Sequence, residues 1–319
     1  VEEKDGAELE YKFFLFKDKN GLMRYTLPSV IQLSPDGKLS YGYKVDNRRK
    51  NNIKYFKQSA FQTTNQVNYS ETEGILYSIW YIASILFDLE EVYGQNFSIQ
   101  MGVPSDSSHL DRAKQTAVSI LVSAYKLVED VFANDKQKFL GTPIKELRSL
   151  TKITPYSQHI KDEYGILVFP EAYACLKPLI KRGKIATGMS LMVDIGGGTT
   201  DMSFFTIEKG MPQVYNFYSL GKGLNFLTGA DSAYRKSTNT IVTSASEIDS
   251  NRRKIYIKEV NNICYNLVEH LKVEYRKQTS LQLFRLIDAL KIRPIIYCGG
   301  GSTFSSLRIP YGGFSVKQQ

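Results

Sequence analysis

The sequence has few of the residues that build metal sites or disulfide frameworks. It contains only three histidines, none of them closely paired, and three cysteines, Cys175, Cys264 and Cys298. An odd number of widely spaced cysteines gives neither a disulfide framework nor a Cys-x-x-Cys metal site, and the histidine spacing argues against zinc. A reducing cytoplasm is therefore the expected location.

The chain also lacks a long apolar run and a recognisable export signal. Its most apolar stretch, 75–87, has about 13 residues and carries Ser and Tyr, whereas a membrane span needs about 20. The first five residues, Val1 to Asp5, are too charged for a signal peptide. We therefore expect no membrane association and interpret 75–87 as part of a buried helix.

The composition favours a folded chain of two lobes. The 319 residues include 42% hydrophobic and 23% charged residues, a balance that is typical of packed cores. The net charge is +9, but the basic clusters are short and are not interleaved with stacking aromatic residues. A nucleic-acid groove is one interpretation of this charge. A solvated surface is the favoured interpretation, and a general attraction for anions, nucleotides included, fits either.

Strand and helix patterns alternate along the chain, which predicts α/β layering. Residues 133–162 are polar and are expected to mix a short strand with a short helix. Helices are predicted where apolar residues recur at helical spacing, at 75–93, 111–131, 246–276 and 280–290. Strands are predicted at 11–16, 23–27, 28–33, 39–45, 97–104, 165–169, 191–194, 202–207, 213–220 and 295–298.

The strongest signal is a glycine turn at residues 194–201, Asp-Ile-Gly-Gly-Gly-Thr-Thr-Asp. Glycine lets the backbone bend sharply and lets amide groups face an anion with no Cβ in the way. Threonine hydroxyls can donate to phosphate oxygens, and Asp194 can hold a hydrated Mg²⁺ or orient a water. The predicted phosphate-binding residues are Gly196, Gly197, Gly198, Thr199 and Thr200.

The segment after the glycines decides what kind of phosphate site this is. A Walker loop or a dinucleotide fingerprint passes from a strand to a helix, whereas residues 202–207 continue as a strand. The pattern therefore predicts a phosphate-binding hairpin. A tight β-turn whose glycines serve only its geometry is the alternative.

The glycine turn resembles the second phosphate loop of the superfamily that holds actin, the sugar kinases and the seventy-kilodalton heat-shock chaperones. The chaperone form is Asp-Leu-Gly-Gly-Gly-Thr-Phe-Asp, which differs only where this chain has Ile195 and Thr200. The chain looks most similar to the nucleotide-binding domain of these chaperones, with actin-like plasmid-segregation proteins as the second choice. The resemblance implies an actin-like (ribonuclease H-like) fold with a nucleotide cleft between lobes at 1–188 and 189–319. The second lobe would include a helical subdomain at about 225–290.

Two further segments resemble family segments that carry catalytic residues. Residues 51–57 are similar to a segment whose Lys helps phosphoryl transfer, which gives that role to Lys57. Residues 170–174 resemble the first connection between the lobes, whose Glu lies near the attacking water and the metal. This gives that role to Glu171. A surface lysine and a glutamate favoured by a helix dipole are the alternatives.

Two more segments resemble nucleotide-contacting loops. Residues 220–223 look like a glycine pair that faces phosphate, so Gly221 is expected there, although Lys222 interrupts the pair. Residues 295–303 resemble the adenosine loop, whose glycines allow the nucleoside to approach closely. The residues expected to line it are Gly299, Gly300, Gly301 and Ser302.

The resemblance implies Mg²⁺-dependent hydrolysis of ATP, with ATP or ADP as ligand and lobe closure as the output. The residues that it makes catalytic are Asp194, Glu171, Lys57 and Thr199, with Asp194 also organising the metal. The family's first phosphate loop is not recognisable in the chain, and Phe304 stands where the family has an Arg. Three readings therefore stay open: a chaperone-like ATPase, a filament-forming actin-like protein, and a non-hydrolysing nucleotide sensor that binds a protein partner.

Overall fold

The computed structural model describes residues 14–34, 36–46, 52–61, 69–94, 98–103, 110–183, 185, 189–208, 210–229, 245–276 and 295–309. The chain divides into two compact units. The first combines 1–60, 69–98 and 119–164, and the second combines 61–68, 99–118 and 165–319. The lobes expected at 1–188 and 189–319 stay a prediction, and the helix expected at 280–290 lies outside the described residues.

The first unit contains a small antiparallel sheet and a hairpin. In the sheet, β3 (Val30–Leu33) lies between β4 (Leu39–Tyr41) and β5 (Asn52–Lys54). The hairpin joins β1 (Phe16–Lys17) to β2 (Met23–Arg24). The β character predicted for this part of the chain is confirmed, although the strands are shorter than the patterns at 23–27 and 39–45 suggested.

The long helix α2 (Glu71–Tyr93) forms the centre of the first unit, after the short helix α1 (Phe56–Phe61). It begins four residues before the predicted start because Ser70 and Glu73 form a capping box. Inside the unit, fully buried Trp80 donates its indole N–H to the Thr151 hydroxyl at 2.9 Å. The predicted buried helix is therefore confirmed, and the capping box is the signal that would have given its start.

Helical structure also fills the region after the second predicted helix. Helix α3 (Leu110–Lys126) passes directly into a π-helical turn, Leu127–Val131, which together confirm the helix expected at 111–131. Between 133 and 162, the described residues form short helices and no strand, so the predicted mixture of strand and helix is wrong there. These helices are α4 (Lys136–Gly141), α5 (Ile144–Leu150) and the start of α6 (Gln158–Glu163).

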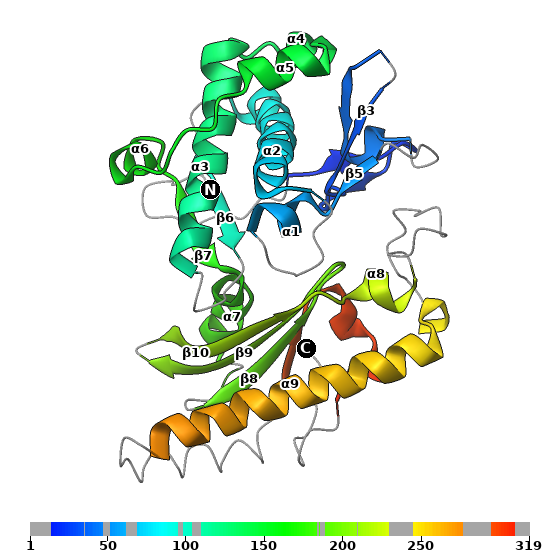
Figure 1. Ribbon diagram of the computed structural model, residues 1–319, viewed down its shortest axis with the longest axis vertical. Helices are drawn as coiled ribbons and strands as arrows, with labels where there is room; N and C mark the ends of the chain where they lie inside the picture. Colours follow the sequence, from blue (N-terminus) through cyan, green and yellow to red (C-terminus); the bar gives the residue numbers. More distant parts are fainter. Residues whose placement is uncertain are drawn as a thin grey trace. The chain divides into compact units, whose positions relative to one another are not determined.

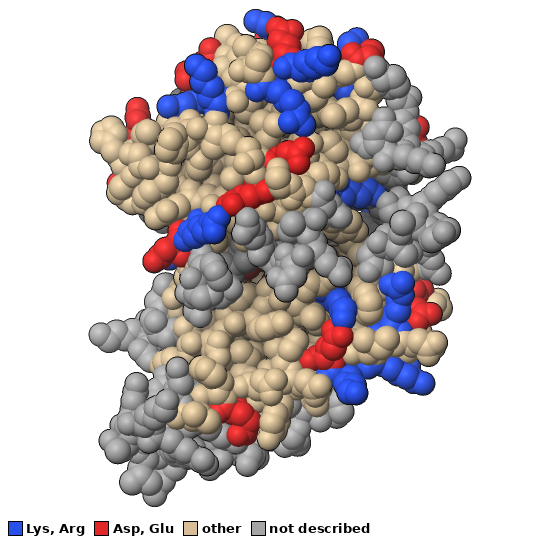
Figure 2. All heavy atoms as spheres, in the orientation of Figure 1, with Lys and Arg blue, Asp and Glu red and all other residues tan. Residues whose placement is uncertain are grey.

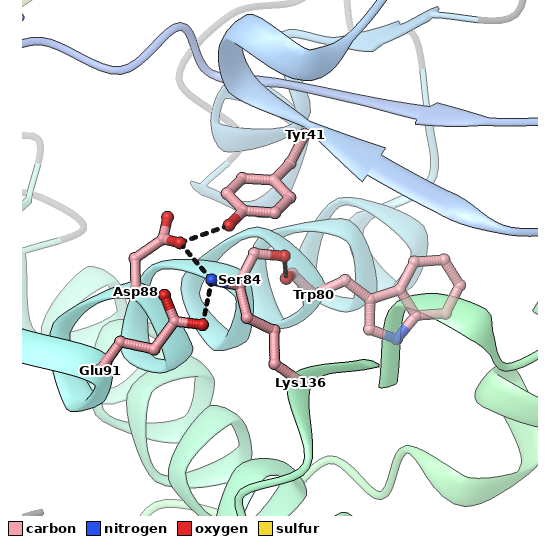
Figure 3. A network of polar contacts seen from close by, with 6 residues as sticks. All are labelled: Tyr41, Trp80, Ser84, Asp88, Glu91 and Lys136. Carbon is pink, nitrogen blue, oxygen red and sulfur yellow. Dashed lines mark hydrogen bonds and ion pairs between the residues drawn. The ribbon is translucent and has the colours of Figure 1, made fainter. Parts of the chain in front are cut away.

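A half-buried polar network ties α4 to α2 and β4 in the first unit (Figure 3). Lys136 Nζ donates to Asp88 Oδ1 at 2.8 Å and to Glu91 Oε1 at 2.7 Å, and the Tyr41 hydroxyl also donates to Asp88 at 2.7 Å. Burial acts to lower the pKa of Lys136, but the bonds to Asp88 and Glu91 outweigh it and raise that pKa. The network therefore keeps Lys136 charged.

The substitution Lys136→Met should lower the free energy of unfolding by about 2 kcal/mol, because it leaves the Asp88 carboxylate half-buried without its cation. Urea unfolding followed by circular dichroism measures this change. The matched control is Lys138→Met, which removes an exposed lysine from the same helix and should change stability by less than about 0.5 kcal/mol. Equal effects of both substitutions would mean that the network contributes nothing specific.

The second unit is built on a four-stranded sheet in the order β10-β9-β8-β11 (Figure 1). Its hairpin-connected strands are β8 (Ser190–Ile195), β9 (Thr200–Glu208) and β10 (Met211–Leu220), and β11 (Ile296–Cys298) runs parallel to β8. A separate parallel pair joins β6 (Gln100–Val103) to β7 (Leu167–Pro170). The strands predicted at 191–194, 202–207, 213–220 and 295–298 are confirmed.

Helices cover both faces of the four-stranded sheet. Side chains of β8 alternate, so that Leu191, Val193 and Ile195 pack on one face with α9 (Ser250–Arg276). Met192 lies on the other face, in a cluster with α7 (Glu171–Lys181). A strand buried on both faces reads as a continuous apolar run, as Leu191-Met192-Val193 does. The α/β layering predicted from the sequence is thereby confirmed.

Charged side chains can be followed on one face of the molecule. On the face drawn in Figure 2, basic and acidic side chains are interspersed and form no single basic stripe. None of the described helices has the combination of length and hydropathy that crossing a bilayer requires.

Candidate functional site

The glycine turn joins β8 to β9 as a hairpin, as the sequence predicts. Ile195 pairs with Thr200 at the end of the ladder, and the Gly196 amide donates to the Thr199 carbonyl oxygen at 2.9 Å. A short helix, α8 (Leu224–Leu227), packs its first turn against the hairpin. Its Leu224 amide donates to the Gly196 carbonyl oxygen at 3.0 Å.

The packing of α8 leaves a set of backbone donors in the turn. In a closed two-residue hairpin, the Thr199 amide would donate back to the Gly196 carbonyl, but Leu224 uses that carbonyl instead. The Gly197 carbonyl likewise accepts from the Asn225 amide at 2.8 Å. Among the described residues, no hydrogen bond uses the amides of Gly197, Gly198 and Thr199 or the Thr199 hydroxyl. Successive unused amides in a turn form a concave site for an anion.

Glycine is required where other loops approach this turn. A Cβ at Gly223, the residue before α8, would lie 2.5 Å from the Gly196 carbonyl oxygen and 2.8 Å from that of Gly197. Both distances are far below van der Waals contact, and both neighbours are backbone atoms that cannot swing away. The sequence pattern assigned phosphate contact to Gly221, which is exposed, whereas Gly223 is the glycine that seats α8 on the turn.

The predicted adenosine loop lies beside the glycine turn because β11 pairs with β8. Cys298 is the register partner of Asp194, so Gly299 follows next to it. Gly299 has φ +75°, and a Cβ there would lie 2.3 Å from Asp194 Oδ1. A Cβ at Gly301 would lie 2.3 Å from Ile195 Cγ2. The structure therefore brings Gly299, Gly300 and Gly301 together with the turn.

The Ser302 side chain forms a hydrogen bond within the predicted adenosine loop. Its hydroxyl donates to the Gly299 carbonyl oxygen at 2.8 Å, and the Thr303 hydroxyl donates to that of Gly300 at 3.0 Å. The loop continues as a 3₁₀ turn, Gly300–Thr303, in which these bonds satisfy the first carbonyl groups.

Asp194 lies half-buried on the α7 face of the sheet. Its Oδ2 accepts a hydrogen bond from the Cys175 thiol, with Sγ 3.2 Å away. The nearby Cys298 thiol, burial and the Asp194 charge, in that order, raise the pKa of Cys175 far above its ordinary value. The thiol therefore stays protonated and orients the carboxylate.

The single carboxylate of Asp194 beside the glycine turn can be compared with what the predicted Mg²⁺ requires. The described residues contain no group of three or more His, Cys, Asp or Glu side chains that could hold an ion. Mg²⁺ commonly needs only one or two carboxylates and takes its other ligands from phosphate and water. Asp194 with a phosphate on the turn meets that requirement, so the residues present fit the predicted metal.

Glu171 belongs to the same unit as the turn. It starts α7 directly after Pro170, and it precedes Cys175 by four residues, which places both on one helix face. A Cβ at Gly102 of β6 would lie 3.0 Å from Glu171 Cγ. Lys57, in contrast, is part of α1 in the first unit, whereas the turn belongs to the second unit. Its role stays a prediction.

Thr200 faces away from the turn's open side. Its side chain is fully buried on the α9 face, and its hydroxyl donates to the Lys222 carbonyl oxygen at 2.8 Å. Thr200 Oγ1 also lies 2.7 Å from the Tyr256 hydroxyl of α9. Since Thr200 has one proton and a carbonyl can only accept, Tyr256 must be the donor to Thr200. We therefore leave Thr200 out of the proposed phosphate contacts.

Tyr256→Phe should lower the free energy of unfolding by about 1 kcal/mol, because Thr200 loses a buried donor with little change in volume. Urea unfolding of the whole chain measures this. Tyr265→Phe, an exposed position on the same helix, is the matched control and should be neutral. A neutral Tyr256→Phe would show that α9 does not hold the turn through this bond.

Sequence reasoning missed the residues that hold the turn from α8 and α9. Lys222 Nζ pairs with Glu259 of α9 at 2.6 Å and lies over the Phe226 ring, 5.1 Å from its centroid. The Asn225 side-chain nitrogen would be 3.8 Å from a Cβ at Gly197, so it borders the glycine turn. No local sequence pattern predicts these contacts. Lys222 and Glu259 are distant in the chain, and α8 has only four residues, too few to show a helical repeat.

No protein-family model matches the chain, and no curated protein matches it. Among solved structures, an archaeal actin homologue is similar at 15% identity over 91% of this chain and 85% of that chain, with a TM-score of 0.40. A ParM filament from Clostridium botulinum is similar at 13% identity over 87% of this chain and 83% of that one, with a TM-score of 0.41. An ADP complex of an archaeal actin homologue matches at 17% identity and a TM-score of 0.24, over 48% of this chain and about half (52%) of that one.

These three structures belong to the actin-like class that the sequence predicts. None of the three is a heat-shock chaperone. The resemblance to the chaperones and the second choice, the actin-like plasmid-segregation proteins, both stay predictions.

Proposed function

We propose that this chain binds ATP or ADP through its glycine turn and is the nucleotide-binding part of an actin-like ATPase. The observation that supports this proposal is the row of unused amides at Gly197, Gly198 and Thr199. Residues of α8 bond to the carbonyl groups of Gly196 and Gly197 and leave these three amides without a backbone acceptor. Three unused amides and an unused hydroxyl in one turn suit a phosphate chain.

Residues near the turn would bind the metal, leave room for the nucleoside and orient the attacking water. Asp194 would hold Mg²⁺, which neutralises phosphate charge when bound. Gly299 to Gly301 would leave room for the nucleoside. Glu171, on the helix that also carries Cys175, would orient the attacking water.

Competition among adenine nucleotides tests the binding proposal. A fluorescent ADP analogue should bind the reduced, full chain in the presence of Mg²⁺, and unlabelled ADP and ATP should displace it. AMP should compete at least about tenfold less well, because loss of the phosphates that reach the amides removes at least one charge-assisted hydrogen bond. AMP competing as well as ADP would contradict binding through the turn.

A second question is whether copies of this chain assemble into filaments. We favour self-association into filaments, because the spelling Phe-Pro-Glu-Ala at 169–172 suits plasmid-segregation actins better than chaperones. Light scattering that rises when ATP is added would support this reading over the chaperone-like and sensor readings. Release of inorganic phosphate from ATP would exclude the sensor reading, and binding without release would favour it.

A further inference from the structure

Two thiols flank the Asp194 carboxylate on the α7 face of the sheet. Asp194 and Cys298 are register partners in the parallel strands β8 and β11, so their side chains stand next to each other. Cys175 reaches the same point from α7 and donates to Asp194 Oδ2. Both cysteines also belong to the apolar cluster between α7 and the sheet. Three segments distant in sequence thus bring two thiols to one carboxylate.

The third cysteine does not share this environment. Cys264 belongs to α9 and is fully buried on the opposite face of the sheet, in the cluster that also contains Tyr256. Cys175 and Cys298 are only partly buried, and all three cysteines are free thiols. A thiol reagent in solution should therefore react with Cys175 and Cys298 faster than with Cys264.

We propose that Cys175 and Cys298 are a modification site, a thiol pair that a small disulfide compound converts to an intramolecular disulfide. We further propose that this disulfide weakens nucleotide binding at the glycine turn beside Asp194. The bond itself follows from the juxtaposition of the two thiols. Its effect on ligand binding rests on the proposed function.

The reaction is two thiol–disulfide exchanges. The Cys298 sulfur, as thiolate, attacks one sulfur of the small disulfide, forms a mixed disulfide and displaces the first small thiolate. The Cys175 sulfur then attacks the Cys298 sulfur, forms the Cys175–Cys298 bond and expels the second small thiolate, which takes up the proton that Cys175 gives. Two protein thiols are oxidised and one small disulfide is reduced to two thiols.

The disulfide would change the site in two ways. It removes the thiol proton that Cys175 donates to Asp194, so the carboxylate loses this hydrogen bond. It also draws α7 and β11 together until the sulfurs are about 2 Å apart. Gly299 follows Cys298 directly and already borders Asp194 Oδ1, so movement of β11 disturbs the carboxylate and the adenosine loop together.

Peptide mapping tests the bond. The reduced full chain is incubated with oxidised glutathione, unreacted thiols are alkylated, and the digest is analysed by mass spectrometry. We expect a peptide pair linked through Cys175 and Cys298, with Cys264 alkylated. Cys264→Ala should keep the linked pair, and Cys298→Ser should lose it. Wild-type protein that carries only glutathione adducts, with no linked pair, would overturn the inference.

Binding of the fluorescent ADP analogue tests the consequence. Oxidation should weaken binding by wild-type protein at least about tenfold, and dithiothreitol should restore it. Cys298→Ser should bind equally well before and after oxidised glutathione. If peptide mapping shows the Cys175–Cys298 disulfide but the affinity for the ADP analogue is unchanged, the proposed effect of the disulfide on binding is overturned. If the reduced protein binds no nucleotide, the proposed function fails, and the peptide map still decides whether the bond forms.

Discussion

The substitution Gly223→Ala is expected to weaken nucleotide binding about a hundredfold, because misplacement of a site by about 1 Å has effects of that size. The new Cβ would lie 2.5 Å from the Gly196 carbonyl oxygen and 2.8 Å from that of Gly197. To relieve this overlap, α8 and the turn must separate, and the bonds from Leu224 and Asn225 must lengthen. The freed Gly196 carbonyl could then pair with Thr199 and take one donor from the phosphate.

Backbone conformation is not the cause of this effect, since Gly223 has φ −136°, which alanine adopts readily. The matched control is Gly141→Ala, where a Cβ meets nothing within 4 Å. Both variants are measured by titration with the fluorescent ADP analogue and by thermal unfolding. A Gly223→Ala protein that binds nucleotide as tightly as Gly141→Ala would show that α8 does not shape the site.

Removal of the Asp194 carboxylate is expected to abolish ATP turnover and leave the fold intact. Asp194→Ala deletes the proposed metal ligand, and Asp194→Asn keeps its shape and an acceptor for Cys175 but removes the charge. Both should lower the rate of phosphate release by at least about a hundredfold, the usual effect of losing a group that stabilises developing charge.

The two Asp194 variants separate charge from packing. If charge matters, Asp194→Asn is as inactive as Asp194→Ala, and excess Mg²⁺ restores neither. Asp162→Asn, in exposed helix α6, is the control for loss of one negative charge and should be fully active. Turnover in Asp194→Asn equal to that of the control would refute the proposed metal-binding role.

The hairpin could be predicted from the sequence because its signals are local. Three glycines stand between two apolar segments, and the second segment continues as a strand. The helix at α2 and the strands of the second unit are likewise fixed by short-range periodicity. The start of α2 was missed only because the Ser70–Glu73 capping box was not used.

The orientation of Thr200 was within reach of the sequence but was not recognised. Counting by two from Thr200 through Met202 to Phe204 places its side chain on an apolar face, where phosphate cannot reach. Asp194 and Asp201, which pair across the ladder, fall on the other face. Alternation in the strand therefore separates Thr199, whose hydroxyl is unused, from Thr200, which is structural.

The contacts of α8, α9 and Cys175 with the turn could not be predicted from local patterns. Gly223 and Gly196 are brought together by the whole length of the β9–β10 hairpin, and Tyr256 reaches Thr200 only through the packing of α9. Such pairings depend on the tertiary fold, and a single sequence carries no signal of them.

A crystal structure of the full chain with Mg²⁺ and ADP tests the central claim most directly. The account predicts a phosphate oxygen at about 2.7–3.2 Å from the backbone nitrogens of Gly197, Gly198 and Thr199, with α8 still bonded to the Gly196 carbonyl. Nucleotide bound elsewhere, with those three amides facing only solvent, would contradict it.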